Sequence, residues 1–166
     1  MNTGPTFSCA INIPSLEKFQ EFGVSLGRSI PSSLVIALNG ELGSGKTTLV
    51  RSLCQGLGCS SLEFVTSPTF VLMQEYQGRC TVNHLDVYRL NDESQFLDFG
   101  GDELFQNGNV VLIEWAEKIK NCLPSTRMDI FLEIVSQSER IINVSLFGDL
   151  VCPQVLAYLS GFDASV

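Results

Sequence analysis

The chain has 166 residues, of which 45% are hydrophobic, and a mean hydropathy of +0.22, so we expect one folded domain over residues 1–166 rather than two domains or a disordered chain. Its net charge of −8, with ten Lys and Arg residues scattered along the sequence, argues against a domain that binds nucleic acid tightly by itself, because such domains carry a basic face. No apolar run approaches the length of a membrane span, and the first residues lack the pattern of a signal peptide, so we expect a cytoplasmic protein with no membrane contact.

The first third of the chain predicts a strand, a helix, a second strand and a second helix. Residues 7–13 alternate loosely between apolar and polar types and predict an edge strand. Ser15 is suited to cap a helix, because apolar residues then recur at helical spacing until Pro31. Residues 34–38 are wholly apolar, as in a buried parallel strand, and residues 48–57 return to helical spacing.

A complete phosphate-loop motif lies between the second strand and the second helix. Gly40, Gly45, Lys46 and Thr47 satisfy the pattern G-x-x-x-x-G-K-[ST] without a mismatch. The glycines allow the backbone to turn its amides towards phosphate oxygens, and the helix that follows adds its positive dipole end. Lys46 is suited to reach the β- and γ-phosphates, and the Thr47 hydroxyl is suited to ligate Mg²⁺. This context favours a nucleotide site over a chance match in a glycine-rich turn.

The rest of the chain predicts short strands and short helices. Strands are expected at residues 70–76, 80–87, 110–113, 128–135 and 140–147, and helical segments at residues 92–99, 116–120 and 153–159. The first two and the last two of these strands are each separated by a few turn residues, which indicates hairpins. The mixture predicts an α/β sheet whose strands are parallel at the nucleotide site and antiparallel at one side.

Two acidic residues are candidates to complete the nucleotide site. A phosphate loop needs a second element that holds Mg²⁺ or orients water, and the carboxyl ends of strands line the ligand crevice of an open α/β sheet. Asp86 ends one predicted strand, and Glu114 follows the apolar run at 110–113 in the manner of a Walker B element. The alternative for each is a solvated strand-end acid or a helix cap. We interpret the neighbouring His84 as a structural hydrogen-bonding residue, and Trp115 either packs near the nucleotide or fills the core.

The segment 66–70 lies between the phosphate-loop helix and the next predicted strand. Phosphate-loop proteins often carry a switch here that senses the γ-phosphate, and the hydroxyls of Thr66, Ser67 and Thr69 suit that role. A turn held by Pro68 accounts for the same residues, so both interpretations stay open.

The cysteines predict neither a metal site nor a disulfide framework. They are Cys9, Cys54, Cys59, Cys80, Cys122 and Cys152. None forms a C-x-x-C pair and the chain has a single histidine, so the spacing of zinc ligands is missing. We expect small, buried, reduced thiols.

Four motifs together resemble those of one protein family. Segments 40–48, 67–70, 84–90 and 113–115 read Gly-Glu-Leu-Gly-Ser-Gly-Lys-Thr-Thr, Ser-Pro-Thr-Phe, His-Leu-Asp-Val-Tyr-Arg-Leu and Ile-Glu-Trp. Their order and spacing are similar to those of the TsaE family, also called YjeE. These are small bacterial ATPases required for making threonylcarbamoyladenosine at position 37 of tRNAs that read codons starting with A. The resemblance covers roughly residues 10–147.

The resemblance implies an α/β fold of the P-loop NTPase type, a three-layer sandwich with a mixed, mainly parallel central sheet. It also implies Mg²⁺-dependent ATP hydrolysis that is weak without partners, within an assembly with TsaB and TsaD. In that assembly TsaD transfers the threonylcarbamoyl group, and tRNA is reached only through the complex.

The resemblance also implies roles for individual residues. Those implied to bind the nucleotide are Glu41, Leu42, Gly43, Ser44, Gly45, Lys46, Thr47 and Thr48. Lys46 and Asp86 would serve hydrolysis, and Thr47 and Glu114 would hold Mg²⁺. The regions around Leu16 and residues 136–140 would hold the adenine.

Two other functions use the same kind of loop. A small-molecule or nucleoside kinase usually needs an arginine-rich lid and an acceptor pocket, and the arginines of this chain form no such cluster in the sequence. A regulatory module that binds nucleotide without hydrolysing it would keep the loop and would not need Asp86 or Glu114.

Overall fold

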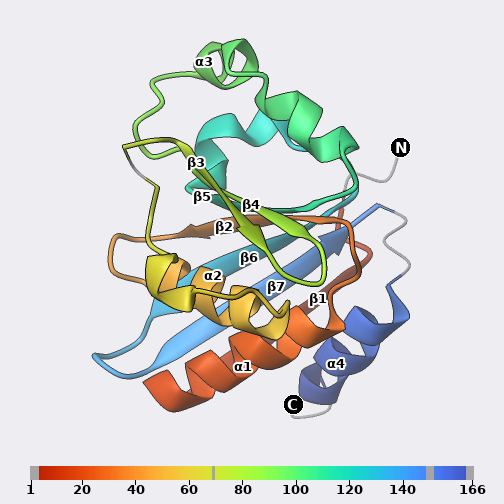
Figure 1. Cartoon of the computed structure of the whole chain (residues 1–166). Coiled ribbons are helices and arrows are strands. Elements are labelled where there is room, and N and C mark those ends of the chain that lie inside the picture. Colours follow the sequence, from red (N-terminus) through yellow and green to blue (C-terminus); the bar gives the residue numbers. More distant parts are fainter. Residues whose placement is uncertain (1–3, 69, 149–151, 164–166) are drawn as a thin grey trace.

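A seven-stranded sheet forms the centre of the computed structural model, which describes residues 4–68, 70–148 and 152–163. The strand order across the sheet is β1-β7-β6-β2-β5-β4-β3 (Figure 1). The strands are β1 (Phe7–Ile13), β2 (Leu34–Gly40), β3 (Met73–Gln77), β4 (Thr81–Asp86), β5 (Val110–Glu114), β6 (Arg127–Ile134) and β7 (Arg140–Phe147). Because β5 lies between β2 and β4, the phosphate loop after β2 comes close to the ends of β5 and β4.

The sheet contains parallel and antiparallel pairs in equal number. β2 pairs in parallel with β6 and β5, and β5 pairs in parallel with β4. The pairs β1–β7, β6–β7 and β3–β4 are antiparallel. The expected mixed sheet with parallel strands at the phosphate loop is confirmed. The expectation of a mainly parallel sheet with antiparallel strands at one side is wrong, because short turns form a hairpin at each side of the parallel centre.

Helices cover the two faces of the sheet unequally (Figure 1). The described residues contain the α-helices α1 (Leu16–Ser29), α2 (Lys46–Gly56), α3 (Glu93–Asp98) and α4 (Pro153–Asp163), and the 3₁₀ helices η1 (Leu62–Phe64), η2 (Gly101–Gln106) and η3 (Ala116–Cys122). α1, α2 and α4 pack on one face, and α3, η2 and η3 pack on the other face over β2, β4 and β5. The expected three layers are therefore present over the central strands, whereas outward residues of β1 and β6, such as Phe131, remain exposed.

The wholly apolar run of β2 is buried on both sides of the sheet. Leu34, Ile36 and Leu38 join the core with α1 and α2, whereas Val35 and Ala37 join the core with α3 and η3. Alternate side chains of a strand point to opposite faces. An apolar residue at every position therefore suits a strand that is covered on both faces.

Most predicted elements have the expected type and place. β1 and β7 have the predicted bounds, and α1 begins after Ser15, whose hydroxyl caps its first turn. The strand expected at 70–76 begins only at Met73, because two amides of the expected strand donate to the Pro68 carbonyl oxygen in a turn. The 3₁₀ helix η2 follows the break at Gly100 and had no sequence prediction.

Glycines let α1 and α2 approach each other at backbone distance. A Cβ atom on Gly27 would lie 2.5 Å from the Leu53 carbonyl oxygen, and one on Gly56 would lie 2.2 Å from the Val24 carbonyl oxygen. No side chain fits at either place without moving a helix. The two glycines therefore set the distance between the phosphate-loop helix and α1.

Arg79, in the turn between β3 and β4, binds the carboxyl ends of both helices. Its guanidinium donates to the carbonyl oxygens of Gly56 at 2.9 Å and Gly27 at 2.8 Å, and also to that of Ile30. Its own amide donates to the Leu57 carbonyl oxygen at 2.9 Å. Helix ends leave carbonyls without partners and carry a partial negative charge. Arg79 therefore attaches the β3–β4 hairpin to the helical layer.

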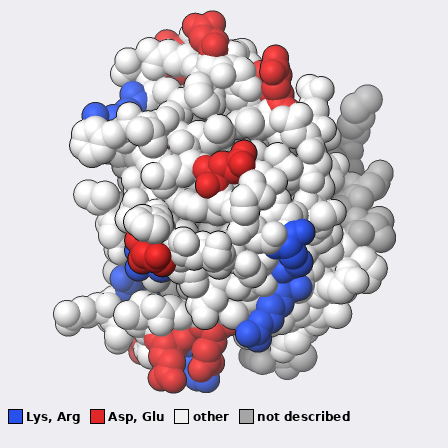
Figure 2. Space-filling model, viewed as in Figure 1, with Lys and Arg blue, Asp and Glu red and all other residues white. Residues whose placement is uncertain are grey.

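The face of the molecule drawn in Figure 2 carries acidic and basic side chains in small separate groups, with no broad basic area on that face. This agrees with the scattered lysines and arginines of the sequence. In the described part of the chain, no helix has the length and apolar character needed to span a membrane.

Candidate functional site

A cavity of about 470 Å³ opens where β2, β5 and β4 end beside the phosphate loop. In the parallel register, Leu38 of β2 and Asp86 of β4 both lie opposite Glu114 of β5. The two acids therefore end neighbouring strands at the same edge of the sheet. The loop forms one wall of the cavity, and Ser67, Asp86, Glu114 and Trp115 contribute to the other.

The phosphate loop has a conformation that needs its glycines. Gly40 and Gly45 have φ angles of 139° and 109°, which residues with a side chain rarely adopt. A Cβ atom on Gly40 would also lie 2.5 Å from the Leu132 carbonyl oxygen. Gly45 precedes α2 and has no side chain to cap it. The first amides of α2 therefore face an anion site of the kind that helix N-termini provide.

Lys46 is 5% exposed and is held at the base of the loop. Its Nζ donates to the carbonyl oxygens of Gly40 at 2.7 Å and Glu41 at 2.9 Å, and lies 3.8 Å from the ring centre of Trp115. Burial lowers the pKa of Lys46, and nearby carboxylates, Glu114 first, oppose part of that effect. The arrangement presents a partly desolvated cation to the cavity, where it can exchange a carbonyl contact for a phosphate oxygen.

Glu114 is the centre of a buried polar network. The Thr47 hydroxyl lies 2.9 and 3.0 Å from the two carboxylate oxygens, and His84 Nε2 lies 2.8 Å from Oε1. His84 Nδ1 lies 3.4 Å from the Tyr76 hydroxyl oxygen. Glu114 is 2% exposed and His84 is fully buried. Because buried polar groups are costly without partners, these contacts orient the carboxylate towards the loop, in agreement with a structural role for His84.

Asp86 is 3% exposed and is held on both sides of its carboxylate. The Tyr88 amide donates to Oδ1 at 2.9 Å, and the Ser67 hydroxyl donates to Oδ2. Ser67 therefore contacts the strand-end acid, and the neighbouring Pro68 carbonyl oxygen accepts from the Val71 and Leu72 amides in a turn. Thr69, one of the hydroxyl residues predicted for a switch, lies outside the described residues.

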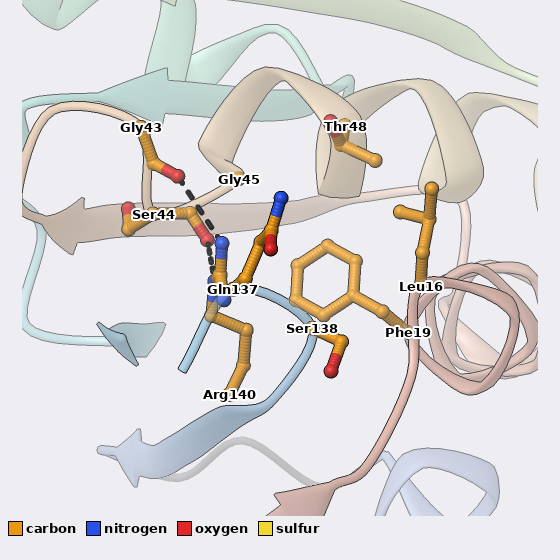
Figure 3. Close-up of a pocket in the computed structure, with 9 residues that line it drawn as sticks. All are labelled: Leu16, Phe19, Gly43, Ser44, Gly45, Thr48, Gln137, Ser138 and Arg140. Atoms are coloured by element: carbon orange, nitrogen blue, oxygen red, sulfur yellow. Dashed lines mark hydrogen bonds between the residues drawn. The ribbon is translucent and has the colours of Figure 1, made fainter. Parts of the chain in front are cut away.

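A smaller cavity of about 170 Å³ adjoins the loop (Figure 3). Leu16 and Phe19 of α1 form one wall, and Gln137 and Arg140 from the β6–β7 turn and the start of β7 form another. Arg140 Nε donates to the Ser44 carbonyl oxygen at 3.0 Å and so fixes that turn to the phosphate loop. An aromatic wall opposite a side-chain amide suits a flat heterocycle that carries polar groups.

The oxygen donors beside the loop suit a magnesium ion. Mg²⁺ prefers oxygen ligands and is usually held by one or two carboxylates together with substrate phosphates. The Thr47 hydroxyl and the Glu114 carboxylate are in contact and line the larger cavity, with Asp86 beside them. Across the described ranges, no three His, Cys, Asp or Glu side chains converge to hold a metal. A hydroxyl and a carboxylate in contact fit an ion that is shared with phosphates.

The structure brings most of the sequence-predicted site residues to the larger cavity. They are Leu42, Gly43, Gly45, Lys46, Thr47, Thr48, Asp86 and Glu114. Ser44 lines the smaller cavity instead, and its buried hydroxyl has no hydrogen-bond partner among the described residues. Glu41 contributes its backbone oxygen to Lys46.

Two aromatic residues, Trp115 and Tyr88, add to the site that the sequence predicted. Trp115, for which two interpretations stood open, has a φ of 61° and lies in the cavity wall. Tyr88, whose ring centre lies 4.8 Å from that of Trp115, also lines the cavity and had no predicted role. Tyr88 belongs to the motif His-Leu-Asp-Val-Tyr-Arg, and this motif was the sequence signal that could have identified it as a site residue.

Sequence and structure comparisons find similar proteins over most of the chain. The family described as "Threonylcarbamoyl adenosine biosynthesis protein TsaE" matches residues 13–142. A "tRNA threonylcarbamoyladenosine biosynthesis protein TsaE" of Treponema pallidum (strain Nichols) is 37% identical over 131 residues, which are 79% of this chain and 96% of that protein. The protein of the same name from Bacillus subtilis (strain 168) is 38% identical over 125 residues, 73% of this chain and 77% of that one. The crystal structure of Bacillus subtilis YdiB aligns with a TM-score of 0.74 at 27% identity and covers 95% of this chain and 97% of that one.

Proposed function

The chain belongs to the TsaE family of tRNA threonylcarbamoyladenosine biosynthesis proteins, and from this membership we propose that it is an Mg²⁺-dependent ATPase that assists the modification of tRNA position 37 together with TsaB and TsaD. In this proposal residues 1–166 form one P-loop ATPase domain. Its ligands are ATP and Mg²⁺, and it reaches tRNA only through the complex.

The contact between Thr47 and Glu114 supports the proposal most strongly. The hydroxyl belongs to the phosphate loop and the carboxylate to the end of β5, yet their oxygens are 2.9 Å apart. Glu114 is 2% exposed beside the anion site, and its carboxylate repels anions. A module that only bound phosphate would therefore not need this residue. A hydroxyl and a carboxylate in contact are instead suited to share a divalent ion that also binds phosphate oxygens.

Each group near the loop has its own role in the proposed hydrolysis. The Lys46 ammonium exchanges a backbone contact for a phosphate oxygen and neutralises charge that develops during transfer. Bound Mg²⁺ would supply further charge neutralisation. Asp86 would orient the attacking water, because Ser67 and the Tyr88 amide hold its carboxylate in one direction.

The adenine ring is proposed to occupy the smaller cavity. Gly43, Gly45 and Thr48 belong to the walls of both cavities, so one nucleotide can place its phosphates on one side of the loop and its base on the other. The Phe19 ring offers an apolar surface to the base, and the Gln137 amide offers a donor and an acceptor.

Rapid hydrolysis is proposed to need the partner proteins. Among the described residues that line the larger cavity, Lys46 is the sole lysine or arginine. An arginine supplied by another protein raises the rate of phosphoryl transfer by about 10³–10⁵-fold in well-studied cases. The net charge of −8 also supports contact with tRNA through partners rather than directly.

Reconstitution with TsaB and TsaD tests the proposal. The protein is combined with both partners, unmodified tRNA and ATP, with release of free phosphate and formation of the modified nucleoside as readouts. We expect Asp86→Asn to lower hydrolysis by about 10²-fold. Asp98→Asn, at an exposed acid of α3, is the matched control and should hydrolyse ATP at the parent rate.

Two results would contradict the proposal. If Asp86→Asn hydrolysed ATP at the parent rate in the full mixture, Asp86 would have no role in the reaction. Transfer of the phosphate to a small-molecule acceptor, without release of free phosphate, would favour the kinase.

A further inference from the structure

Two cysteines meet where α2 ends, away from the phosphate loop. Cys54 lies in the last turn of α2, and Cys59 follows the helix after Gly58. α2 has eleven residues, so its two ends are about 16 Å apart. Neither thiol has a part in the proposed ATPase reaction.

The backbone at the end of α2 forces these two side chains together. The Cys59 amide donates to the Cys54 carbonyl oxygen at 2.9 Å, the Gly58 amide donates to the Gln55 carbonyl oxygen at 3.1 Å, and Gly58 has a φ of 76°. These are the two hydrogen bonds and the left-handed glycine of a Schellman motif, which frequently places the side chains of its first and last residues in contact. The two thiols are close enough that each shifts the pKa of the other.

The backbone hydrogen bond from the Cys59 amide to the Cys54 carbonyl oxygen also limits the distance between the two Cα atoms. A Cα atom lies about 2.4 Å from its own carbonyl oxygen and about 1.5 Å from its own amide nitrogen. With a hydrogen bond of 2.9 Å, the Cα atoms of Cys54 and Cys59 are at most about 6.8 Å apart. Disulfides bridge Cα atoms about 4.4–6.8 Å apart. The folded backbone therefore keeps the two Cα atoms within the range that a disulfide bridges.

The two thiols differ in reactivity in a way that suits successive steps. The neighbouring Cys54 thiol and the nearby Arg79 guanidinium lower the pKa of Cys59, against the effect of its burial. The neighbouring Cys59 thiol and burial raise the pKa of Cys54. Cys59 retains 7% exposure, whereas Cys54 has none. A thiolate is the reactive form towards peroxides, so Cys59 is the thiol that reacts first.

We propose that Cys54 and Cys59 are a dithiol site that hydroperoxides oxidise to an intramolecular disulfide. The Cys59 thiolate attacks one oxygen of hydrogen peroxide, the O–O bond breaks, and a sulfenic acid and hydroxide form. The Cys54 sulfur then attacks the Cys59 sulfur, an S–S bond forms, and the hydroxyl leaves as water with the Cys54 proton. Two thiols are oxidised and one peroxide is reduced to two waters in total. A dithiol reductant then reduces the disulfide and restores both thiols, and is itself oxidised.

Cys80 is a third nearby cysteine and offers Cys59 an alternative disulfide partner. Cys80 lies beyond Arg79, is partly exposed, and has its pKa raised by burial. Gly78 stands against Cys59, since a Cβ atom on this glycine would lie 3.0 Å from the Cys59 sulfur. The Schellman contact aligns Cys54 with Cys59, and no comparable backbone hydrogen bond links Cys59 to Cys80 among those of the described residues.

Tryptic mapping of the full-length protein after treatment with hydrogen peroxide distinguishes these pairings. Residues 52–79 contain Cys54 and Cys59 with no internal lysine or arginine, and Cys80 falls in the next peptide. We expect peptide 52–79 to lose about 2 Da and to regain it with dithiothreitol. In Cys54→Ser the sulfenic acid should persist at Cys59, where dimedone traps it.

Cys122→Ser, in η3 on the other face of the sheet, is the matched control and should form the same disulfide as the parent. In the parent, Cys59 should react at least about tenfold faster than Cys122, whose pKa burial raises. A cross-link between peptide 52–79 and the peptide that contains Cys80 would overturn the proposed pairing. Oxidation of Cys122 while Cys54 and Cys59 stay reduced would overturn the site altogether, and neither result depends on the folding of a variant.

Discussion

Removing the charge of Glu114 without changing its shape tests the proposed magnesium site. We expect Glu114→Gln to lose most of the gain in ATP affinity that Mg²⁺ provides. An amide keeps an oxygen that can accept from Thr47, which lies 2.9 Å from the carboxylate, but it cannot balance a divalent cation. Binding of ADP in the presence of a chelator should not weaken, because that binding depends on the loop amides and Lys46 and the change removes a charge that repels anions.

The size of the effect follows from the burial of the carboxylate. A carboxylate and a divalent cation about 4 Å apart interact by about 8 kcal/mol at an effective dielectric constant of about 20. Glu114 is 2% exposed, so little solvent screens it, although the retained amide dipole and entering water recover part of the loss. We therefore expect about 2–4 kcal/mol, which is a loss of about 30- to 1000-fold in the contribution of Mg²⁺ to ATP affinity.

Calorimetric titration of ATP, with Mg²⁺ and with a chelator, measures this contribution directly. Glu103→Gln is the matched control, because it removes the same charge at an exposed position of η2 and should keep the full Mg²⁺ effect. Circular dichroism and thermal unfolding exclude a folding defect in either variant. If Glu114→Gln retained the parent dependence on Mg²⁺, the assignment of Glu114 as a metal-binding residue would be refuted.

Lys46→Ala should weaken ATP binding by at least about tenfold and AMP binding much less, because only ATP carries the phosphates that the ammonium faces; equal losses in calorimetry would contradict this. Arg79→Ala should lower the free energy of unfolding by about 1–3 kcal/mol, since it leaves helix-end carbonyls without a donor, and a urea midpoint equal to that of the parent would rule the attachment out. Burial raises the pKa of Tyr76 and Tyr158 to about 12 from the ordinary 10.0. The folded state therefore holds these protons more tightly than the unfolded state, and their stabilising contribution, complete below about pH 10, is lost as the pH rises towards 12. Tyr158→Phe should flatten the fall of unfolding free energy in that range, and an unchanged slope in urea titrations would disprove the assignment.

Local patterns of the sequence were sufficient for the individual elements. The alternation of residues in β1 and β7, the wholly apolar run of β2 and the cap of α1 at Ser15 depend on torsions and spacings within a few residues. One failure was also local. The start of β3 moved because Leu72 has a φ of 67°, and a leucine in that conformation leaves no signal that distinguishes it from a strand residue.

The loop and its two acids show where the sequence stops being sufficient. The pattern from Gly40 to Thr47 defines an anion-binding turn by itself, because glycine torsions and a helix start produce it. Asp86 and Glu114 could be identified only as strand-end acids, each with a solvated alternative. Their adjacency depends on β5 entering the sheet between β2 and β4, and a strand order is a property of the whole sheet.

The sequence by itself therefore determined the family resemblance, the type of most elements and the anion-binding loop, since all of these rest on neighbouring residues. Only the tertiary structure decided which distant groups share a cavity or a contact. Arg140 reaches the carbonyl oxygen of Ser44, 96 residues away, and Arg79 joins the ends of two helices. Such contacts form because burial of the apolar faces fixes the relative position of the strands and helices, and no pattern along the chain records that position.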